Sequence, residues 1–127
     1  MINHLKIGKM GEDIACEYLI NRHWKVLGRN YRRKSDEIDI IARSKDKTLV
    51  FVEVKSLRRA EALLSAAFTP EDNLSSAKLH KISRTCEFFA RKYSWLIDAD
   101  RGWRIDLIAI DLNYDGSPID LRHYENI

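Results

Sequence analysis

The sequence has few of the residues that mark disulfide-rich, zinc-binding or membrane proteins. Its 127 residues include only two cysteines, Cys16 and Cys86, and both lie in stretches with helical spacing and without partners at metal-ligand spacing. We therefore expect reduced, buried thiols. The four histidines are scattered, which disfavours a zinc site. The longest apolar runs are only a few residues, so no segment is expected to span a bilayer.

Targeting and low-complexity segments are also missing. The first residues, MINHLKIGKMGEDIACEYL, contain acids and amphipathic spacing, and they lack the apolar core and the cleavage site of a signal peptide. There is no internal repeat and no linker. A content of 45% hydrophobic and 32% charged residues is typical of a soluble globular protein. We expect one cytoplasmic domain that covers residues 1–127.

Positive charge is concentrated in a few stretches, although the net charge is only +3. The segment 22–34 contains no acidic residue and carries these basic ones: Arg22, Lys25, Arg29, Arg32, Arg33 and Lys34. Such clustering favours a phosphate-bearing partner. An ordinary solvated surface would have the same composition.

Hydrophobic periodicity predicts the element order α-β-β-β-α-β-β, a mixed sheet with helices packed on it. The helices are expected over 4–21 and roughly 74–94. The strands are expected over 24–28, where a glycine ends the strand, then over 37–43, 49–55 and 103–112, with a last edge strand in IDLRHY. The stretch 56–76 lacks periodicity and contains Pro70, which indicates a surface loop.

Acidic residues stand inside two apolar strands, in the segment EIDIIARSKDKTLVFVEVK at 37–55. Side chains alternate along a strand, so Glu37, Asp39 and Ile41 are expected on one face of the first strand. By the same rule Leu49, Phe51, Glu53 and Lys55 share one face of the second strand, and Val50, Val52 and Val54 share the other. Whether the two polar sets meet depends on the register of the hairpin.

A five-residue turn over 44–48 would pair Arg43 with Leu49 and bring the polar sets together. Asp39 would then lie opposite Glu53, and position 37 would lie opposite position 55. A four-residue turn would send the two sets to opposite faces of the sheet. We adopt the five-residue turn as the prediction.

The β-carbons of Asp39 and Glu53 would then lie about 5 Å apart. Like charges at that spacing repel, and partial burial raises the cost. Such a pair persists by sharing a proton, by forming salt bridges or by chelating a cation. Oxygen ligands without a nearby histidine or cysteine favour Mg²⁺ or Mn²⁺. Lys55 could orient or deprotonate the attacking water, or stabilise phosphorane charge. A solvent-facing Glu–Lys pair would give the same pattern.

Several segments together resemble the YraN family of small bacterial proteins, which is predicted to be endonuclease-like. They are GKMGEDIA at 8–15, NYRR at 30–33, EIDIIA at 37–42, LVFVEVK at 49–55 and RIDLIAI at 104–110, with Lys78 in the second helix. The acidic strand followed by E-V-K also resembles the active site of the PD-(D/E)xK nuclease superfamily. This resemblance implies a restriction-endonuclease-like α/β fold. Ile38 stands in place of the superfamily's proline, and Asp36 in place of the family's usual glycine.

The resemblance also implies roles for the acidic residues and for Mg²⁺ or Mn²⁺ as cofactor. Asp39 and Glu53 would hold the cation. The expected catalytic set is Asp39, Glu53, Lys55, Glu12 and Glu37. Glu12 follows Gly8 by four residues, as a first-helix glutamate follows a glycine in archaeal Holliday-junction resolvases, which implies an outer metal ligand or a water-positioning acid. A solvated glutamate at the rim of the helix fits equally well.

A set of basic side chains is expected to contact nucleic acid: Arg32, Arg33, Lys34, Arg58, Lys78, Lys81 and Arg84. The second helix has an apolar arc and an opposite cationic arc, which suits a helix that packs on the sheet and faces a phosphate backbone. We expect these residues to position phosphates, because nothing here specifies a base-reading code. An ordinary surface helix shows the same division.

The sequence and the resemblance together predict a metal-dependent nuclease that hydrolyses phosphodiester bonds in DNA, with branched or structured DNA as substrate. DNA is favoured over RNA as the nucleic-acid partner. No membrane partner is expected, and a homodimer is implied by many relatives. Two other interpretations remain open. One is a nucleic-acid-binding module that keeps the fold without turnover, and the other is a structural protein with a carboxylate–lysine network. Asp106 is expected in a buried salt bridge with a nearby arginine.

Overall fold

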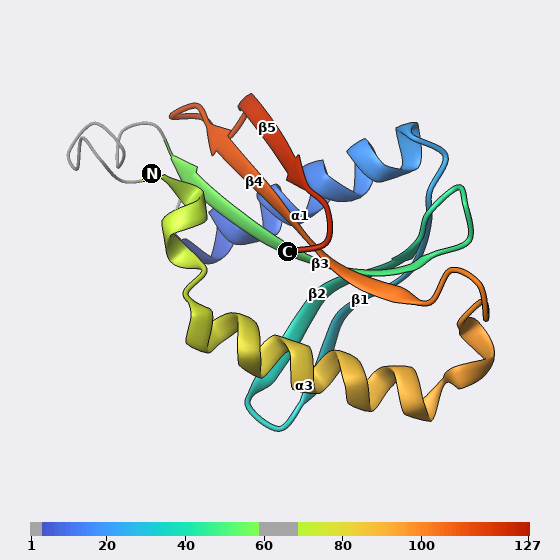
Figure 1. Ribbon diagram of the computed structural model, residues 1–127. Helices are drawn as coiled ribbons and strands as arrows, with labels where there is room; N and C mark the ends of the chain where they lie inside the picture. Colours follow the sequence, from blue (N-terminus) through green and yellow to red (C-terminus); the bar gives the residue numbers. More distant parts are fainter. Residues whose placement is uncertain (1–3, 59–68) are drawn as a thin grey trace.

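The computed structural model describes residues 4–58 and 69–127 and shows a mixed five-stranded sheet between two helices (Figure 1). The elements are α1 (His4–Asn21), β1 (Lys25–Arg33), β2 (Asp36–Arg43), β3 (Leu49–Arg58), η1 (Pro70–Asn73), α3 (Ser76–Lys92), η2 (Ser94–Leu96), β4 (Trp103–Leu112) and β5 (Pro118–Tyr124). The predicted order α-β-β-β-α-β-β is confirmed, with a short 3₁₀ turn added on each side of α3.

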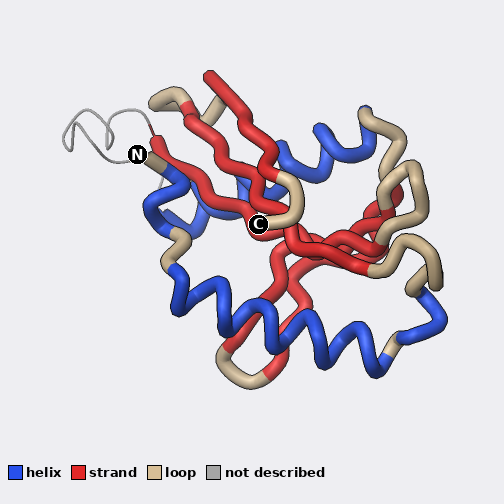
Figure 2. Tube along the Cα trace, viewed as in Figure 1, coloured by secondary structure: helices blue, strands red, loops and turns tan. Residues whose placement is uncertain are grey.

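The sheet has the strand order β1-β2-β3-β4-β5, and only β3 and β4 run parallel. The connection between these two strands carries α3 across one face, and Figure 2 shows α1 on the opposite side of the strands from α3. A parallel pair covered on both faces has apolar residues on both sides. The long buried stretches of β3 and β4 follow from this position.

Alternation along the middle strands divides the apolar side chains between two cores. The core on the side of α1 contains Val50, Val52 and Val54 of β3 together with residues of α1 such as Ala15 and Leu19. The core on the side of α3 contains Leu49, Phe51, Ile82, Cys86 and Phe89, among others. The predicted faces of β3 and the apolar arc of the second helix are therefore confirmed. Both cysteines are buried and free.

Several predicted boundaries are wrong. Gly28 does not end the first strand, because β1 shifts its register between Val26 and Gly28 and continues to Arg33. A backbone that bulges at a glycine can stay in the ladder. Part of the predicted loop 56–76 belongs to β3, which extends to Arg58, and another part forms η1. Its positions 59–68 lie outside the described residues.

A buried aspartate fastens the C-terminal part of the chain to the sheet. Asp106 is fully buried, and its carboxylate accepts hydrogen bonds from Arg104 Nε at 2.9 Å and from the Asn126 amide at 3.0 Å. The His123 ring contributes a further contact at 2.8 Å. These partners hold the pKa of Asp106 below its usual range despite burial. The expected salt bridge with an arginine is confirmed.

No helix in residues 4–58 and 69–127 has the length and apolar character needed to cross a membrane. Helix α1 instead packs closely on β3. A β-carbon added at Gly11 would lie 1.8 Å from Ser56 Oγ and 3.0 Å from Ser56 Cβ, whereas one added at Gly8 would meet nothing within 4 Å. Of these two glycines of α1, only Gly11 is required for close packing against β3, because a side chain at Gly8 would meet no neighbouring atom.

We predict opposite effects of alanine at these two glycines. Gly11→Ala should lower the free energy of unfolding by about 1–3 kcal/mol, because the new methyl group overpacks the contact with β3. Gly8→Ala should raise it by up to about 1 kcal/mol, because alanine favours a helix interior. Denaturant unfolding measures both values. Adding Ser56→Ala should restore part of the loss in Gly11→Ala, and equal effects at both glycines would contradict this packing.

Candidate active site

The hairpin of β2 and β3 opens at Asp39. The predicted register is present, since Arg43 pairs with Leu49 and the ladder continues to Ile40 with Val52. The strand pairs end there, so the expected pairs 39–53 and 37–55 are not part of the ladder. The amide of Val54 instead donates to Asp39 Oδ2 at 2.8 Å. A side-chain carboxylate thus replaces a backbone carbonyl where the two strands diverge.

The alternation of side chains between the two faces of the sheet is also interrupted at this point of β2. Ile38 packs in the same core as Ile41, on the side of α3, whereas Ile40 packs on the side of α1. The prediction that Glu37, Asp39 and Ile41 share one face is therefore wrong. The two acids lie with Glu12 of α1, and Ile41 lies with the apolar residues under α3. Because the backbone of β2 is irregular here, Glu37 and Asp39 do not lie on the apolar face that α3 covers.

Three carboxylates from α1 and β2 converge at the opening. One carboxylate oxygen each of Glu12, Glu37 and Asp39 lies within 4.8 Å of the others, and each side chain is half-buried. Burial and the charge of Asp39 raise the pKa of Glu12. The predicted assisting acids Glu12 and Glu37 are therefore placed beside Asp39, although they come from different elements.

Glu53 and Lys55 approach the same point from β3. Lys55 Nζ lies 3.2 Å from Glu53 Oε1, with side-chain exposures of 23% and 9%. Burial and the neighbouring Glu53 charge raise the pKa of Asp39 to about 8. Burial also raises the pKa of Glu53, while Lys55 opposes that rise. The predicted trio of aspartate, glutamate and lysine is thus brought together.

The buried carboxylate of Glu53 bears on whether this site fits a cation. With Asp39 ionised, Glu53 Oε2 is buried and has no hydrogen-bond partner among the described residues. An unsatisfied buried carboxylate oxygen is costly. A divalent cation with oxygen ligands would satisfy it and would remove the repulsion between the acids. The donor set therefore fits Mg²⁺ or Mn²⁺, for which Asp39 and Glu53 were predicted as ligands.

Two residues next to the acids were missed in the prediction of site residues. Arg29 lies 2.8 Å from Asp13 Oδ1 and 3.5 Å from Glu12 Oε1. With its amide nitrogen directed at the carboxylates, Asn30 donates to Glu12 at 2.9 Å and to Glu37 at 2.8 Å. One feature of the sequence could have drawn attention to Asn30. Asparagine is rare within strands and favours left-handed backbone.

Four of the predicted phosphate-binding residues meet in one hollow between the β1–β2 turn and α3. Its lining comprises Arg33, Lys34, Ser35, Asp36, Lys81 and Arg84. The Arg33 guanidinium also lies 4.0 Å from the centre of the Phe88 ring, which fixes it beside α3 by a cation–π contact. We call these six residues the basic hollow.

The other predicted phosphate-binding residues lie apart from the basic hollow. Arg32 is exposed and pairs with Glu37 at 3.0 Å. Lys78 is exposed at the start of α3 and donates to the Asn73 carbonyl at 3.0 Å. Arg58 is buried, with its guanidinium 5.4 Å from the centre of the Tyr114 ring. This burial leaves little of Arg58 for a phosphate.

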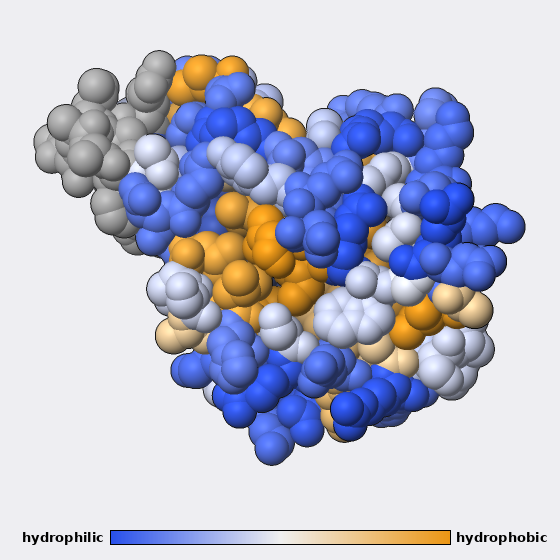
Figure 3. All heavy atoms as spheres, viewed as in Figure 1, coloured by the Kyte–Doolittle hydropathy of each residue, from blue (hydrophilic) through white to orange (hydrophobic). Residues whose placement is uncertain are grey.

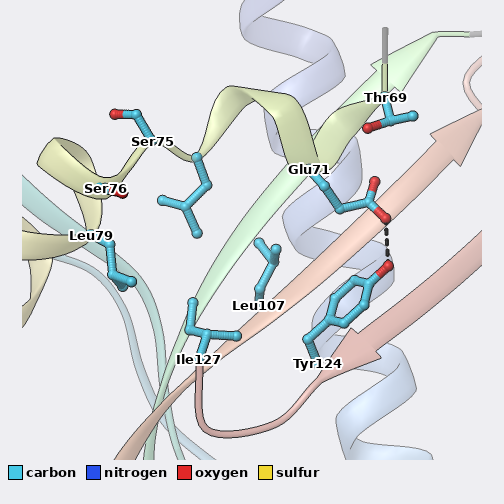
Figure 4. Close-up of a pocket in the computed structure, with 9 residues that line it drawn as sticks. Thr69, Glu71, Ser75, Ser76, Leu79, Leu107, Tyr124 and Ile127 are labelled. Carbon is cyan, nitrogen blue, oxygen red and sulfur yellow. Dashed lines mark hydrogen bonds between the residues drawn. The ribbon is translucent and has the colours of Figure 1, made fainter. Parts of the chain in front are cut away.

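A separate apolar pocket of about 480 Å³ opens between η1, the start of α3 and the C-terminus (Figure 4). Figure 3 shows apolar surface gathered near the C-terminus, with hydrophilic surface around it. Among the residues that line it, Glu71 has an acidic side chain. Hydrogen bonds from Arg122 and Tyr124 lower the pKa of Glu71 to about 2. None of the predicted site residues lines this pocket.

We predict a pH-dependent gain in stability for Asp39→Asn in metal-free protein. A carboxyl with a raised pKa binds its proton more tightly in the folded chain, so its contribution to stability falls as pH rises from about 4 to about 8. The variant should therefore resemble wild type at pH 4 and have the higher melting temperature at pH 8. Thermal unfolding in EDTA checks this.

The control is Asp115→Asn in the β4–β5 turn. Hydrogen bonds from the Ser117 amide and hydroxyl lower the pKa of Asp115. Its stabilisation is lost as pH falls, so this variant should be less stable than wild type at pH 8. The same sign in both variants would contradict the assignment for Asp39.

Comparisons with known proteins identify the family to which this chain belongs. The model of a family described as "Uncharacterised protein family UPF0102" matches residues 11–110. A UPF0102 protein of Campylobacter lari is 39% identical over 103 residues, 81% of each chain. One of Dictyoglomus turgidum is 33% identical over 125 residues, 98% of each chain, and one of Syntrophus aciditrophicus is 36% identical over 121 residues, 95% of this chain and 88% of the relative. The matched span includes Glu12, Asn30, Asp39, Glu53 and Lys55, and the chain belongs to the UPF0102 (YraN) family.

Proposed function

We propose that this protein is a metal-dependent nuclease of the PD-(D/E)xK type that hydrolyses phosphodiester bonds in DNA. The observation that supports it most is the convergence of Asp39, Glu53 and Lys55 where β2 and β3 diverge. A half-buried aspartate beside a buried glutamate, with a lysine at their side, is costly for stability alone. Chemistry at the site gives a reason for keeping it.

Asp39 and Glu53 would hold the cation, with Glu12 and Glu37 close enough to Asp39 to assist. The cation would supply positive charge against a phosphate and lower the pKa of an attacking water. The ammonium of Lys55 lies 3.2 Å from Glu53 Oε1, and the Lys55 side chain is 23% exposed. From there it can orient the water, or donate to oxygens that gain charge as the phosphate is attacked.

The basic hollow would contact the phosphate backbone away from the scissile bond. Side chains of both signs line it, but the basic ones dominate and come from two elements, the β1–β2 turn and α3. The β1–β2 turn leads directly into β2, which carries Asp39. Nucleic acid bound in the basic hollow would therefore lie only a few residues along the chain from the candidate active site. Such contacts give affinity without reading bases. Exposed Arg32 and Lys78 would extend this surface.

Branched or structured DNA is the proposed substrate class, on the strength of the resemblance to junction resolvases. Two copies of the chain would allow paired strands to be cut, so a homodimer belongs to this proposal. A binding module without turnover shares the basic hollow but does not require the carboxylates. Cleavage therefore separates the two functions, and a panel of duplex, single-stranded, flap and four-way DNA provides the test.

We predict that Asp39→Ala, Glu53→Ala and Lys55→Ala each reduce cleavage by about 100-fold or more, since each removes a cation ligand or the group that acts on water. EDTA should abolish cleavage, and Mg²⁺ or Mn²⁺ should restore it. Initial rates on the best substrate of the panel measure the effect. The exposed residues Glu17 and Lys45 provide the matched controls, Glu17→Ala and Lys45→Ala.

Circular dichroism and thermal unfolding establish that each variant is folded. Full activity in folded variants at positions 39, 53 and 55 would refute the catalytic assignment. Salt-dependent DNA affinity without cleavage of any substrate would leave the binding module in its place.

We also predict that Lys81→Gln/Arg84→Gln weakens DNA binding in EDTA and reduces its salt dependence. Each lost phosphate contact lowers the slope of log K against log salt by about 0.9, so the double variant should lose up to about 2 units. Fluorescence anisotropy over a salt series gives the slope. The control Lys45→Gln/Lys47→Gln removes the same charge from the exposed β2–β3 turn and should change the slope little. Equal slopes for the two double variants would exclude the basic hollow as the binding surface.

A further inference from the structure

The backbone at Asn30 is unusual for a residue inside a strand. Its φ of 54° lies in the left-handed region, although β1 continues to Arg33. The ladder pairs Arg29 with Ile40 and Tyr31 with Ile38, so Asn30 falls opposite Asp39 without being paired to it. Left-handed backbone in a non-glycine residue carries a cost and often occurs at functional sites.

The Asn30 side chain contacts two acids from different elements. Its amide lies 2.9 Å from Glu12 Oε1, 3.3 Å from Glu12 Oε2 and 2.8 Å from Glu37 Oε1. With the nitrogen directed at them, the amide donates to both carboxylates and offsets part of their repulsion. Asn30 therefore connects α1 to β2 at the point where the acids converge.

The same position also suits an oxygen ligand. A rotation of 180° about the last side-chain bond of asparagine, roughly a half turn, exchanges the positions of the amide oxygen and nitrogen without changing the shape of the side chain. Neighbouring ligand oxygens around an octahedral Mg²⁺, with bonds of about 2.1 Å, lie about 3 Å from one another. The distances from the Asn30 amide to Glu12 Oε1 and Glu37 Oε1 match that spacing. Asparagine carbonyls are ordinary ligands of such hard cations.

We propose that Asn30 is an oxygen ligand of the divalent cation bound by the acidic cluster, which comprises Glu12, Glu37, Asp39 and Glu53. We further propose that the amide nitrogen of Asn30 holds Glu12 and Glu37 together when no cation is bound. The proposal rests on the cation of the proposed function. When Asp39 is ionised, Glu53 Oε2 is buried without a hydrogen-bond partner among the described residues, and this observation supports a cation at the site independently of Asn30. A purely structural role for Asn30 would require only its left-handed backbone, which glycine also supplies.

Two substitutions separate the ligand role from the donor role. Asn30→Gly keeps the left-handed backbone and removes both the oxygen and the nitrogen. Asn30→Asp keeps an oxygen ligand, removes the donor and adds a negative charge. The matched control is Asn126→Gly, since Asn126 has φ 55° and contacts the sheet through its backbone amide, away from the acidic cluster.

The experiment is calorimetric titration of Mn²⁺ into each protein, with melting temperatures measured in EDTA. Asn30→Gly should weaken Mn²⁺ binding by about 10-fold or more, and Asn126→Gly should leave it unchanged. Asn30→Asp should bind Mn²⁺ at least as tightly as wild type but melt at a lower temperature in EDTA. This combination follows only if the amide provides both an oxygen and a donor.

Other results would overturn the assignment. Wild-type affinity in Asn30→Gly would remove Asn30 from the ligands. Weakened binding in both Asn30→Gly and Asn30→Asp would leave a donor role alone. If wild type itself binds no Mn²⁺, the inference and the cation of the proposed function fail together. If wild type binds Mn²⁺ through Asn30 and cleaves no DNA, the nuclease proposal fails and the ligand assignment stands.

Discussion

The hydrogen bond from the Val54 amide to the Asp39 carboxylate is the contact on which the candidate site depends. It lies where the ladder between β2 and β3 stops after Ile40 and Val52. A strand that loses its partner leaves backbone donors unpaired inside the protein, and these must be satisfied. Asp39 satisfies one of them, and the carboxylate is thereby held between the two strands.

This position explains why acids from several elements gather there. The opened strands leave space that Glu12 of α1 and Glu37 of β2 enter from one side, while Glu53 approaches from β3. Gly11 allows α1 to lie close to β3, which sets the distance of Glu12 from the sheet. The repulsion among the acids is offset by Lys55, Arg29 and Asn30. The site is thus a local excess of negative charge with positive and amide groups around it.

The apolar and the charged parts of the structure serve different purposes. The two cores fix the sheet between α1 and α3. Asp106 and its hydrogen-bond partners attach the C-terminal residues to the sheet. The acidic cluster and the basic hollow add little to that stability, because surface and partly buried ion pairs contribute weakly or at a cost. Their arrangement is accounted for by the phosphate chemistry proposed for them.

The order of elements and the apolar faces of β3 and α3 followed from the sequence alone. The register of Arg43 with Leu49 matches the five-residue turn, which the sequence allowed alongside a four-residue turn. Local periodicity and the length of one turn determine these features. The sequence also indicated Asp39, Glu53 and Lys55, because charges within apolar strands are conspicuous. Its predictions were wrong for the end of β1 and for the face of Ile41, where a bulge and a diverging strand interrupt the alternation.

Only the tertiary structure decided which side chains meet across elements. The contact of Asn30 with Glu12 and Glu37 depends on a left-handed residue in β1 and on the packing of α1, and no local pattern encodes the combination. The burial of Arg58 and the meeting of Arg33 with α3 were likewise set by packing between distant segments. Periodicity determines the faces of single elements, whereas the distances between side chains on different elements arise when those elements pack together.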